Sequence, residues 1–318
     1  MPKDNYKYNE IARLRDIDSR CFDLSRYSRN LNLEALQGKI GAVYNRENII
    51  DSVQKVLLRR NKANVLLTGE AGCGKTAIAE GLAHRIVNIR MDWQKAVDKA
   101  ASDAVAAITE SGEIVKPKSV PKPLSADYII YELSLNSLLS GSKYRGEFEE
   151  KLQKVLHTVS QNKDIILFID EIHQINTIGN SEGAIGMGQI LKPALARDEL
   201  RVIGATTTEE AEILKKDKAL ARRFSEIIVP QISGESAVEC LAKIMVDYSA
   251  FHKIKIKDVE AKNLLEAVTF FMQGSVFPNN VIDVIDETLA AAKYDGKKTV
   301  GMAEINQTLS RISGYIIC

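Results

Sequence analysis

Residues 69–76 read Gly-Glu-Ala-Gly-Cys-Gly-Lys-Thr, a complete G-x-x-x-x-G-K-T phosphate loop. An apolar, strand-like stretch precedes this loop at 64–67, and a helical stretch follows it at 77–86. In such a loop the backbone N–H groups turn toward a chain of phosphates, the lysine reaches the β- and γ-phosphates, and the threonine hydroxyl ligates Mg²⁺. The positive N-terminal end of the following helix points at the same anion. The predicted nucleotide contacts are Gly69, Glu70, Ala71, Gly72, Cys73, Gly74, Lys75, Thr76 and Ala77.

Further apolar stretches follow the loop, with helical stretches between them. They lie at 128–133, 164–169 and 200–206. Short strands that alternate with helices are typical of an α/β fold with a parallel sheet. We expect three parts, which are a helical lead-in at 1–37, a large α/β domain at 38–230 and a smaller α-helical domain at 231–318.

Composition narrows the classes of partner. Lys and Arg number 43 against 42 Asp and Glu, so charge gives no reason to expect nucleic acid or an acidic membrane as partner. No apolar run approaches the ~20 residues of a membrane span, and the polar start does not resemble a signal peptide. The four cysteines form no C-x-x-C pair, which is typical of a reduced, cytoplasmic protein. The four histidines have no metal-ligand spacing.

An acidic pair, Asp170-Glu171, follows the apolar stretch 165–169. Ligands of open α/β sheets bind at the carboxyl ends of strands, so we expect this pair to face the phosphate loop. Asp170 would then hold Mg²⁺, directly or through water, and Glu171 would polarise the attacking water as general base. A carboxylate that merely caps the next helix is the less favoured interpretation.

Two other segments are ambiguous from their residues alone. The stretch 201–205 leads into three threonines, one of which could orient the water or sense the γ-phosphate, although threonine is common at strand ends. Arg222 and Arg223 follow a helical stretch, where they either complement the helix dipole or reach a neighbouring subunit as arginine fingers. Such a finger raises kcat by about 10³–10⁵-fold in other phosphate-loop enzymes.

One stretch interrupts the α/β pattern. Apolar residues recur at helical spacing from Trp93 to Ile108, and a stretch rich in Lys and Pro follows at 115–123. A surface helix with a loose return is the favoured interpretation, and a docking element for a partner is the alternative.

Several blocks of the chain resemble the first ATPase module of the Clp/ClpB class of AAA+ protein unfoldases. They lie at 24–31, 38–40, 76–83, 141–152 (GSKYRGEFEEKL), 191–197, 204–207, 216–224 and 277–287. The resemblance covers residues 24–318. It implies an AAA+ large domain with a central parallel sheet, a small helical lid, and a hexameric ring in which each ATP site is completed by its neighbour.

The resemblance also implies roles for single residues. Asp170 and Glu171 correspond to the Walker B pair, Thr207 to sensor one, and Arg222 and Arg223 to residues that act across the ring interface. The residues that the resemblance places in the central pore, where Tyr144 would grip a polypeptide, are Lys143, Tyr144 and Arg145. Those that it places against the adenine base are Val43, Tyr44 and Ile282.

The chain also departs from the family. The family's G-R-x-x-E-I reads Tyr-Asn-Arg-Glu-Asn-Ile at 44–49, so the glycine is missing and the arginine is shifted. Asn279 and Asn280 replace an acidic residue and a lysine, so we assign no sensor-two residue. Residues 91–118 resemble an insertion, which an adaptor or partner protein could bind. Cys73 stands where the family often has valine, and a helix N-terminus can lower a thiol pKa. Oxidation there could block ATP binding, but a small side chain that merely fits is the favoured interpretation.

We therefore expect a ring ATPase that uses ATP and Mg²⁺ to unfold, thread or remodel polypeptides through a central pore. Its expected partners are further copies of itself and a polypeptide client. The alternative is a nucleotide-gated assembly factor or adaptor that uses ATP binding and hydrolysis as a switch without translocation. A DNA-handling AAA+ protein is a weaker third hypothesis, against which the near-neutral charge counts.

Overall fold

The computed structural model describes residues 3–111, 116–140, 145–176, 187–196 and 200–314 of the 318-residue chain. These residues form two compact units. The second unit contains Val43–Glu47, Thr68–Lys75 and the residues from Ile228 onward, and the first contains the remainder. Two short segments that precede residue 76 are thus part of the second unit, although they are distant from it in sequence.

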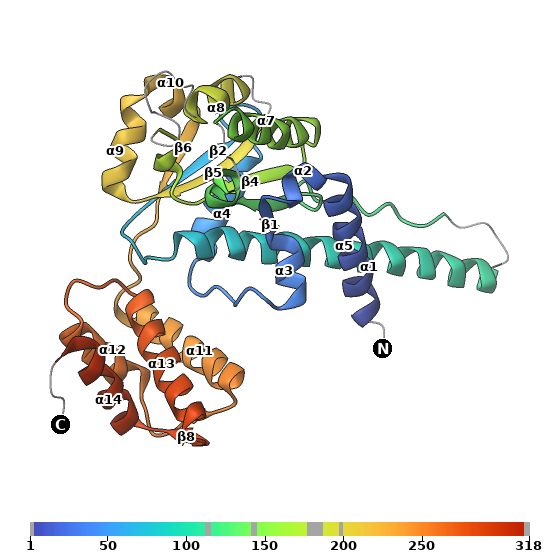
Figure 1. The fold of residues 1–318 in the computed structure, drawn as a ribbon. Coiled ribbons are helices and arrows are strands. Elements are labelled where there is room, and N and C mark those ends of the chain that lie inside the picture. Colours follow the sequence, from blue (N-terminus) through green and yellow to red (C-terminus); the bar gives the residue numbers. More distant parts are fainter. Residues whose placement is uncertain (1–2, 112–115, 141–144, 177–186, 197–199, 315–318) are drawn as a thin grey trace. The chain divides into compact units, whose positions relative to one another are not determined.

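A six-stranded sheet forms the centre of the first unit (Figure 1). Its strand order is β1 (Ser28–Asn30), β3 (Ile129–Leu133), β4 (Ile165–Ile169), β5 (Arg201–Thr206), β2 (Asn64–Thr68) and β6 (Phe224–Ile228). The strands β3, β4 and β5 pair in parallel, whereas β1 pairs with β3 in the antiparallel direction. The expected α/β fold class is confirmed, and the antiparallel edge strand is a feature that the sequence did not reveal.

The central strands are apolar along their whole length because both faces of the sheet are covered. Every residue of β2 and of β4 is buried, as expected for strands of a parallel sheet between two layers of helices. The helices of the first unit are α1 (Lys3–Arg20), α2 (Phe22–Ser25), α3 (Leu31–Gln37), α4 (Glu47–Leu57), α5 (Lys75–Ser111), α6 (Leu135–Leu139), α7 (Arg145–Gln161), α8 (Met187–Ala196), α9 (Thr208–Lys216) and α10 (Lys218–Ala221), with a 3₁₀ turn, η1 (Ile172–Asn176).

The helix α5 extends well past the edge of the sheet (Figure 1). It runs without a break from Lys75 to Ser111, so the predicted insertion begins inside a single helix of 37 residues. The indole N–H of Trp93 donates to the carbonyl of Val120 at 3.3 Å, and Arg90 forms an ion pair with Glu10 of α1 at 2.8 Å. The returning chain and α1 therefore both lie against this helix, which supports the interpretation as a surface helix with its return.

The second unit is mainly helical. Its helices are α11 (Gly234–His252), α12 (Ala261–Phe271), α13 (Asn279–Tyr294) and α14 (Met302–Ser313), and β7 (Lys255–Ile256) pairs in parallel with β8 (Thr299–Val300). Leu241, Leu264, Val281, Leu289 and Leu309 are fully buried in its core. Among the described residues, every helix of the chain is too short or too polar to cross a lipid bilayer.

Candidate nucleotide-binding site

The phosphate loop has the backbone that its glycines predict. Gly72 and Gly74 have φ angles of 81° and 93°, which residues other than glycine rarely adopt. A Cβ atom at Gly69 would lie only 2.5 Å from the carbonyl oxygen of Val229, so the chain passes too close here for any side chain. The loop is therefore closely specified by three of its glycines.

Lys75 lies folded across the loop from which it projects. Its ammonium group donates to the carbonyl oxygens of Gly69 at 3.0 Å and of Glu70 at 2.8 Å, and the residue is 7% exposed. Lys75 is also the first residue of α5, so the N–H groups of the first turn have no partner within the helix. A buried ammonium beside these donors fits a phosphate group.

The structure joins the two predicted magnesium ligands. The Thr76 hydroxyl donates to Asp170 Oδ2 at 2.8 Å, although 94 positions separate the two residues. The other carboxylate oxygen, Oδ1, accepts the N–H of Glu171 at 2.9 Å. A hydroxyl and a carboxylate are hard oxygen ligands of the kind that Mg²⁺ prefers, so this pair fits the ion that the sequence predicts.

Glu171, the predicted general base, has a strained backbone. Its φ angle of +51° lies in the left-handed region, which is uncommon for residues other than glycine. Strain of this kind is concentrated at functional sites and persists only where the surroundings enforce it. The side chain is 45% exposed, and its Oε2 lies 3.4 Å from Nδ1 of His173.

Thr207 begins α9 as its N-cap residue. Its hydroxyl accepts the N–H of Glu210 at 3.2 Å and donates to Glu210 Oε2 at 2.7 Å, which completes a capping box. The preceding residue, Thr206, is fully buried at the end of β5, with Oγ1 3.0 Å from His173 Nδ1. The role of Thr207 as sensor one stays a prediction, and its hydroxyl already serves a local purpose.

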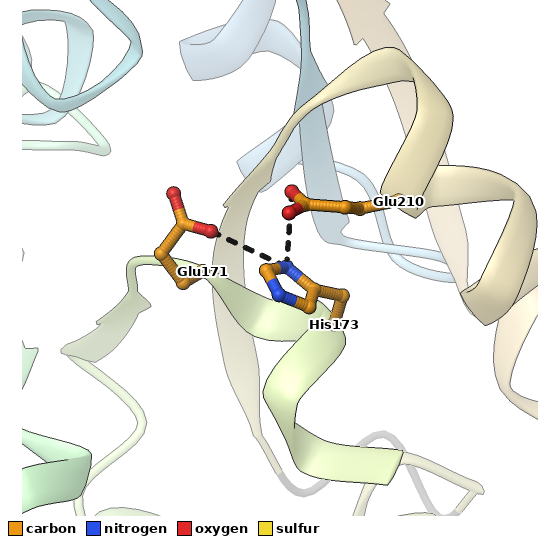
Figure 2. Close-up of side chains that lie close together, drawn as sticks. All are labelled: Glu171, His173 and Glu210. Carbon is orange, nitrogen blue, oxygen red and sulfur yellow. Dashed lines mark ion pairs between the residues drawn. The ribbon is translucent and has the colours of Figure 1, made fainter. Parts of the chain in front are cut away.

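His173 lies between two glutamates (Figure 2), an arrangement that sequence reasoning missed. Its Nδ1 is 3.4 Å from Glu171 Oε2 and 3.2 Å from Glu210 Oε2. One donor atom from each of the three residues lies within 4.8 Å of the others, close enough to share a cation. Glu210 Oε2, however, already accepts hydrogen bonds from Thr206 and Thr207, so hydrogen bonding accounts for the cluster. The spacing of histidines along the chain could not reveal this cluster, because Glu210 approaches His173 only in the folded chain.

The two predicted arginine fingers follow the short helix α10. Asp217 caps this helix by accepting the N–H groups of Ala219 and Leu220, both at 3.2 Å. Its second oxygen forms an ion pair with Lys192 of α8 at 2.5 Å. Beyond the helix, Asn64 of β2 donates to the carbonyl oxygen of Arg223 at 3.2 Å. The segment that carries the arginines is thus fixed at both ends.

A positively charged cleft of about 530 Å³ lies beside this segment. Four cationic side chains contribute to its wall, namely Lys62, Lys192, Arg222 and Arg223. Cations that converge on one cleft attract anions. The role of Arg222 and Arg223 as arginine fingers stays a prediction.

The predicted adenine contacts lie in the second unit. Tyr44 and Ile282 are partly buried and pack against the same apolar cluster. The Tyr44 hydroxyl donates to Asp247 of α11 at 2.7 Å, and burial together with this hydrogen bond raises the pKa of Tyr44 to about 12. The half-buried Val43 precedes Tyr44 in the same short segment of this unit. Contact with the base stays a prediction for all three residues.

Arg46 has a role that the sequence did not indicate. It is 5% exposed, and its guanidinium donates to the carbonyl oxygen of Cys73 at 2.6 Å and to that of Pro230 at 2.7 Å. Burial lowers its pKa. The shifted arginine of the 44–49 segment thus joins the phosphate loop to the chain just ahead of the helical lid.

Cys73 is fully buried, and burial raises the pKa of its thiol despite the nearby Lys75 and Arg46. A neutral, inaccessible thiol is a poor target for oxidation. The structure therefore argues against the thiol switch and supports a small side chain that fits the loop.

The predicted pore residues Lys143 and Tyr144 lie outside the described residues. Arg145 is the first residue of α7. The pore assignment thus rests on the sequence.

The model of the AAA family, "ATPase family associated with various cellular activities", matches residues 65–231. The chain belongs to the AAA family of ATPases. An AAA lid domain matches residues 233–315, which identifies the helices α11 to α14 of the second unit as a lid. This AAA protein is thus an ATP-hydrolysing enzyme that binds nucleotide.

Relatives among well-described proteins narrow the resemblance. The chain is 39% identical over 299 residues to the chaperone protein ClpB of Aquifex aeolicus (strain VF5). The matched region covers 92% of this chain and 26% of that protein. It is 35% identical over 292 residues to ClpB of Staphylococcus aureus (strain COL), which covers 91% of this chain and 30% of that protein. The chain therefore spans less than a third of these relatives, and its resemblance to the Clp/ClpB class is confirmed.

Solved structures give the same result. A closed-state cryo-EM reconstruction of Hsp104 with ATPγS and FITC-casein has a TM-score of 0.72 and 33% identity, covering 92% of this chain and 45% of that one. The S. cerevisiae Hsp104–ADP complex has a TM-score of 0.71 and 32% identity, with the same coverage.

Proposed function

We propose that this chain is the ATPase module of a ring-forming machine that unfolds, threads or remodels polypeptides at the expense of ATP. The observation that carries the proposal is the Thr76–Asp170 hydrogen bond beside Glu171. It supports an intact hydrolytic centre in a chain that shares 35–39% of its residues with ClpB chaperones. A solved Hsp104 structure in the same family contains casein, which supports a polypeptide client.

The residues of this chain divide the work of hydrolysis. Lys75 and the first-turn N–H groups of α5 would bind the phosphates, and Thr76 and Asp170 would hold Mg²⁺. When bound, the ion neutralises the charge of the transferred phosphoryl group. Glu171 would accept the proton of the attacking water as general base.

The cationic cleft supports a ring in which each site is completed by the next subunit. Arg222 and Arg223 belong to the first unit, which also holds Asp170 and Glu171. We propose a hexamer in which one of these arginines reaches the nucleotide of a neighbour. Such an interaction supplies charge stabilisation only in the assembled ring.

The mechanical step is assigned to Tyr144, with Lys143 and Arg145 beside it. The aromatic side chain of Tyr144 would grip a polypeptide regardless of its sequence, because its contacts are mainly apolar. An adaptor or partner protein could bind the 91–118 segment. The relatives are chaperones, which favours this function over a nucleotide-gated assembly factor.

Steady-state ATP turnover with and without casein tests the proposal, with Tyr144→Ala and Glu171→Gln beside the parent chain. We expect casein to stimulate the parent, Tyr144→Ala to keep basal turnover without stimulation, and Glu171→Gln to bind nucleotide without hydrolysing it. Turnover that ignores casein in both the parent and Tyr144→Ala would contradict threading by this chain.

A further inference from the structure

His173 has one ring nitrogen, Nδ1, that faces three oxygens at once. These oxygens are Thr206 Oγ1 at 3.0 Å, Glu210 Oε2 at 3.2 Å and Glu171 Oε2 at 3.4 Å. Both carboxylate oxygens can only accept, so a lone pair on Nδ1 would be repelled by them. The nitrogen therefore carries a proton, and a single N–H donor is shared among several acceptors.

Glu210 does not depend on this donor. Its Oε2 accepts the Thr207 hydroxyl at 2.7 Å, the Thr207 N–H at 3.1 Å and the Thr206 hydroxyl at 3.2 Å. Burial acts to raise the pKa of Glu210, but these hydrogen bonds and the nearby imidazole outweigh it and hold the pKa below its ordinary value. Glu210 is thus an ionised group with three donors besides His173, so the Nδ1–H group can be shared with Glu171 without leaving Glu210 unpaired.

Glu210 also belongs to the element that leads to the predicted arginine fingers. It is the third residue of α9, which ends at Lys216, and Asp217 links α9 directly to α10. Arg222 is the C-cap of α10, whose N-terminal turn is held by Asp217. His173 thus contacts the start of the α9–α10 segment, which is followed by Arg222 and Arg223.

Glu171 lies on the other side of His173, with its Oε2 3.4 Å from Nδ1. Its side chain is half exposed, and its backbone, with a strained φ of +51°, lies two residues after the end of β4. In the orientation of Figure 2 the carboxylate turns toward His173 and thus toward α9. A displacement of α9 by a fraction of an ångström changes which acceptor the Nδ1–H group favours, because hydrogen bonds weaken steeply with distance and angle.

We propose that His173 is a positioning residue that couples Glu171 to the α9–α10 segment. In the ring, contact of Arg222 or Arg223 with a neighbour's nucleotide would shift α9. The Nδ1–H group of His173 would then turn toward Glu210 or away from it, and so release or hold the general base, Glu171. The chain would thereby sense its neighbour's nucleotide at its own catalytic carboxylate. This inference rests on the proposed ring ATPase and adds the residue that links two of its sites.

The test compares His173→Leu with His173→Asn in the complete chain. Leucine fills a similar volume without a donor, whereas the asparagine amide keeps an N–H close to the position of Nδ1. His157→Leu is the matched control, because His157 lies on the exposed face of α7. For each variant kcat, KM and the Hill coefficient for ATP are measured, with the Kd of a fluorescent ADP analogue and ring assembly by sedimentation.

We expect His173→Leu to lower kcat by about tenfold, a fraction of what a general base contributes, with the nucleotide Kd unchanged and the Hill coefficient reduced to one. His173→Asn should retain most of the rate and the cooperativity, and His157→Leu should match the parent. A cooperative His173→Leu enzyme, or an asparagine variant as impaired as the leucine variant, would overturn the coupling. A parent chain that does not hydrolyse ATP at all would instead refute the proposed function.

Discussion

Replacing Arg46 by methionine tests whether its guanidinium holds the phosphate loop in its binding form. Methionine keeps the length and apolar stem but removes both donors, leaving the carbonyls of Cys73 and Pro230 without the bonds at 2.6 Å and 2.7 Å. A hydrogen bond to a charged group contributes about 1.5–3 kcal/mol. Removing the buried charge also removes its desolvation cost, which is seen in the lowered pKa of Arg46, and this offsets part of the loss of hydrogen-bond energy. A net loss of about 2–3 kcal/mol remains.

Most of this loss should appear in nucleotide affinity, because the bonds order the loop that surrounds the phosphates. Since 1.4 kcal/mol is a factor of ten, the Kd for ATP should rise about 30–150-fold in a fluorescence titration. Arg46→Lys retains one donor group and should fall between the parent and Arg46→Met. Arg59→Met is the control, because Arg59 is exposed and its guanidinium donates to the hydroxyl of Ser225 in the first unit at 3.1 Å. If the Kd of Arg46→Met for ATP is within threefold of the parent value and its thermal stability is unchanged, the two hydrogen bonds of Arg46 have no role in ordering the loop.

Three further outcomes follow from the same geometry. Glu171→Gln should retain nucleotide binding but lose roughly 10³-fold in turnover, and turnover within tenfold of the parent would exclude Glu171 as the base. Gly69→Ala should abolish binding in an isothermal titration, because its Cβ would meet the carbonyl of Val229 at 2.5 Å, and intact binding would show that the loop can yield. The Glu210 pKa is lowered in the folded chain, so the carboxylate stabilises the fold above its unfolded pKa and this contribution disappears as pH falls through the folded value. Melting temperatures of the parent and Glu210→Gln should therefore converge between about pH 5 and pH 3, and a constant difference would refute the assignment.

The buried strands of the parallel sheet and the proximity of Thr76 to Asp170 could be predicted from the sequence. The apolar stretches at 64–67 and 164–169 are too uniform for anything but covered strands, and both strands are fully buried. Ligands of a parallel sheet gather at the carboxyl ends of its strands. Together with the phosphate-loop motif, that rule predicts that Thr76 lies near Asp170, and the two residues form a direct hydrogen bond.

The Glu171–His173–Glu210 cluster could not be predicted because its partners are set by elements that meet only in the fold. The position of Glu210 follows from a capping box at 207–210, which the sequence does contain as a Thr-x-x-Glu pattern. The position of His173 depends on a 3₁₀ turn that directly follows a strained residue. A capping box predicts where a helix begins but not which side chain approaches it from another strand.

The contacts of Arg46 are harder still to predict from the sequence, because its partners are main-chain carbonyls. Every residue has a carbonyl, so neither Cys73 nor Pro230 carries a side chain that marks it as a partner of arginine. The family pattern suggested a glycine and an arginine near the adenine, and the shift of the arginine appeared only as a departure from it. In the structure, the guanidinium of Arg46 donates to two carbonyl oxygens at once. A planar guanidinium suits such a bridge, since its donors have a fixed fork geometry. A comparison of residues alone would therefore read Arg46 as a lost contact, whereas the geometry gives it the task of holding the phosphate loop.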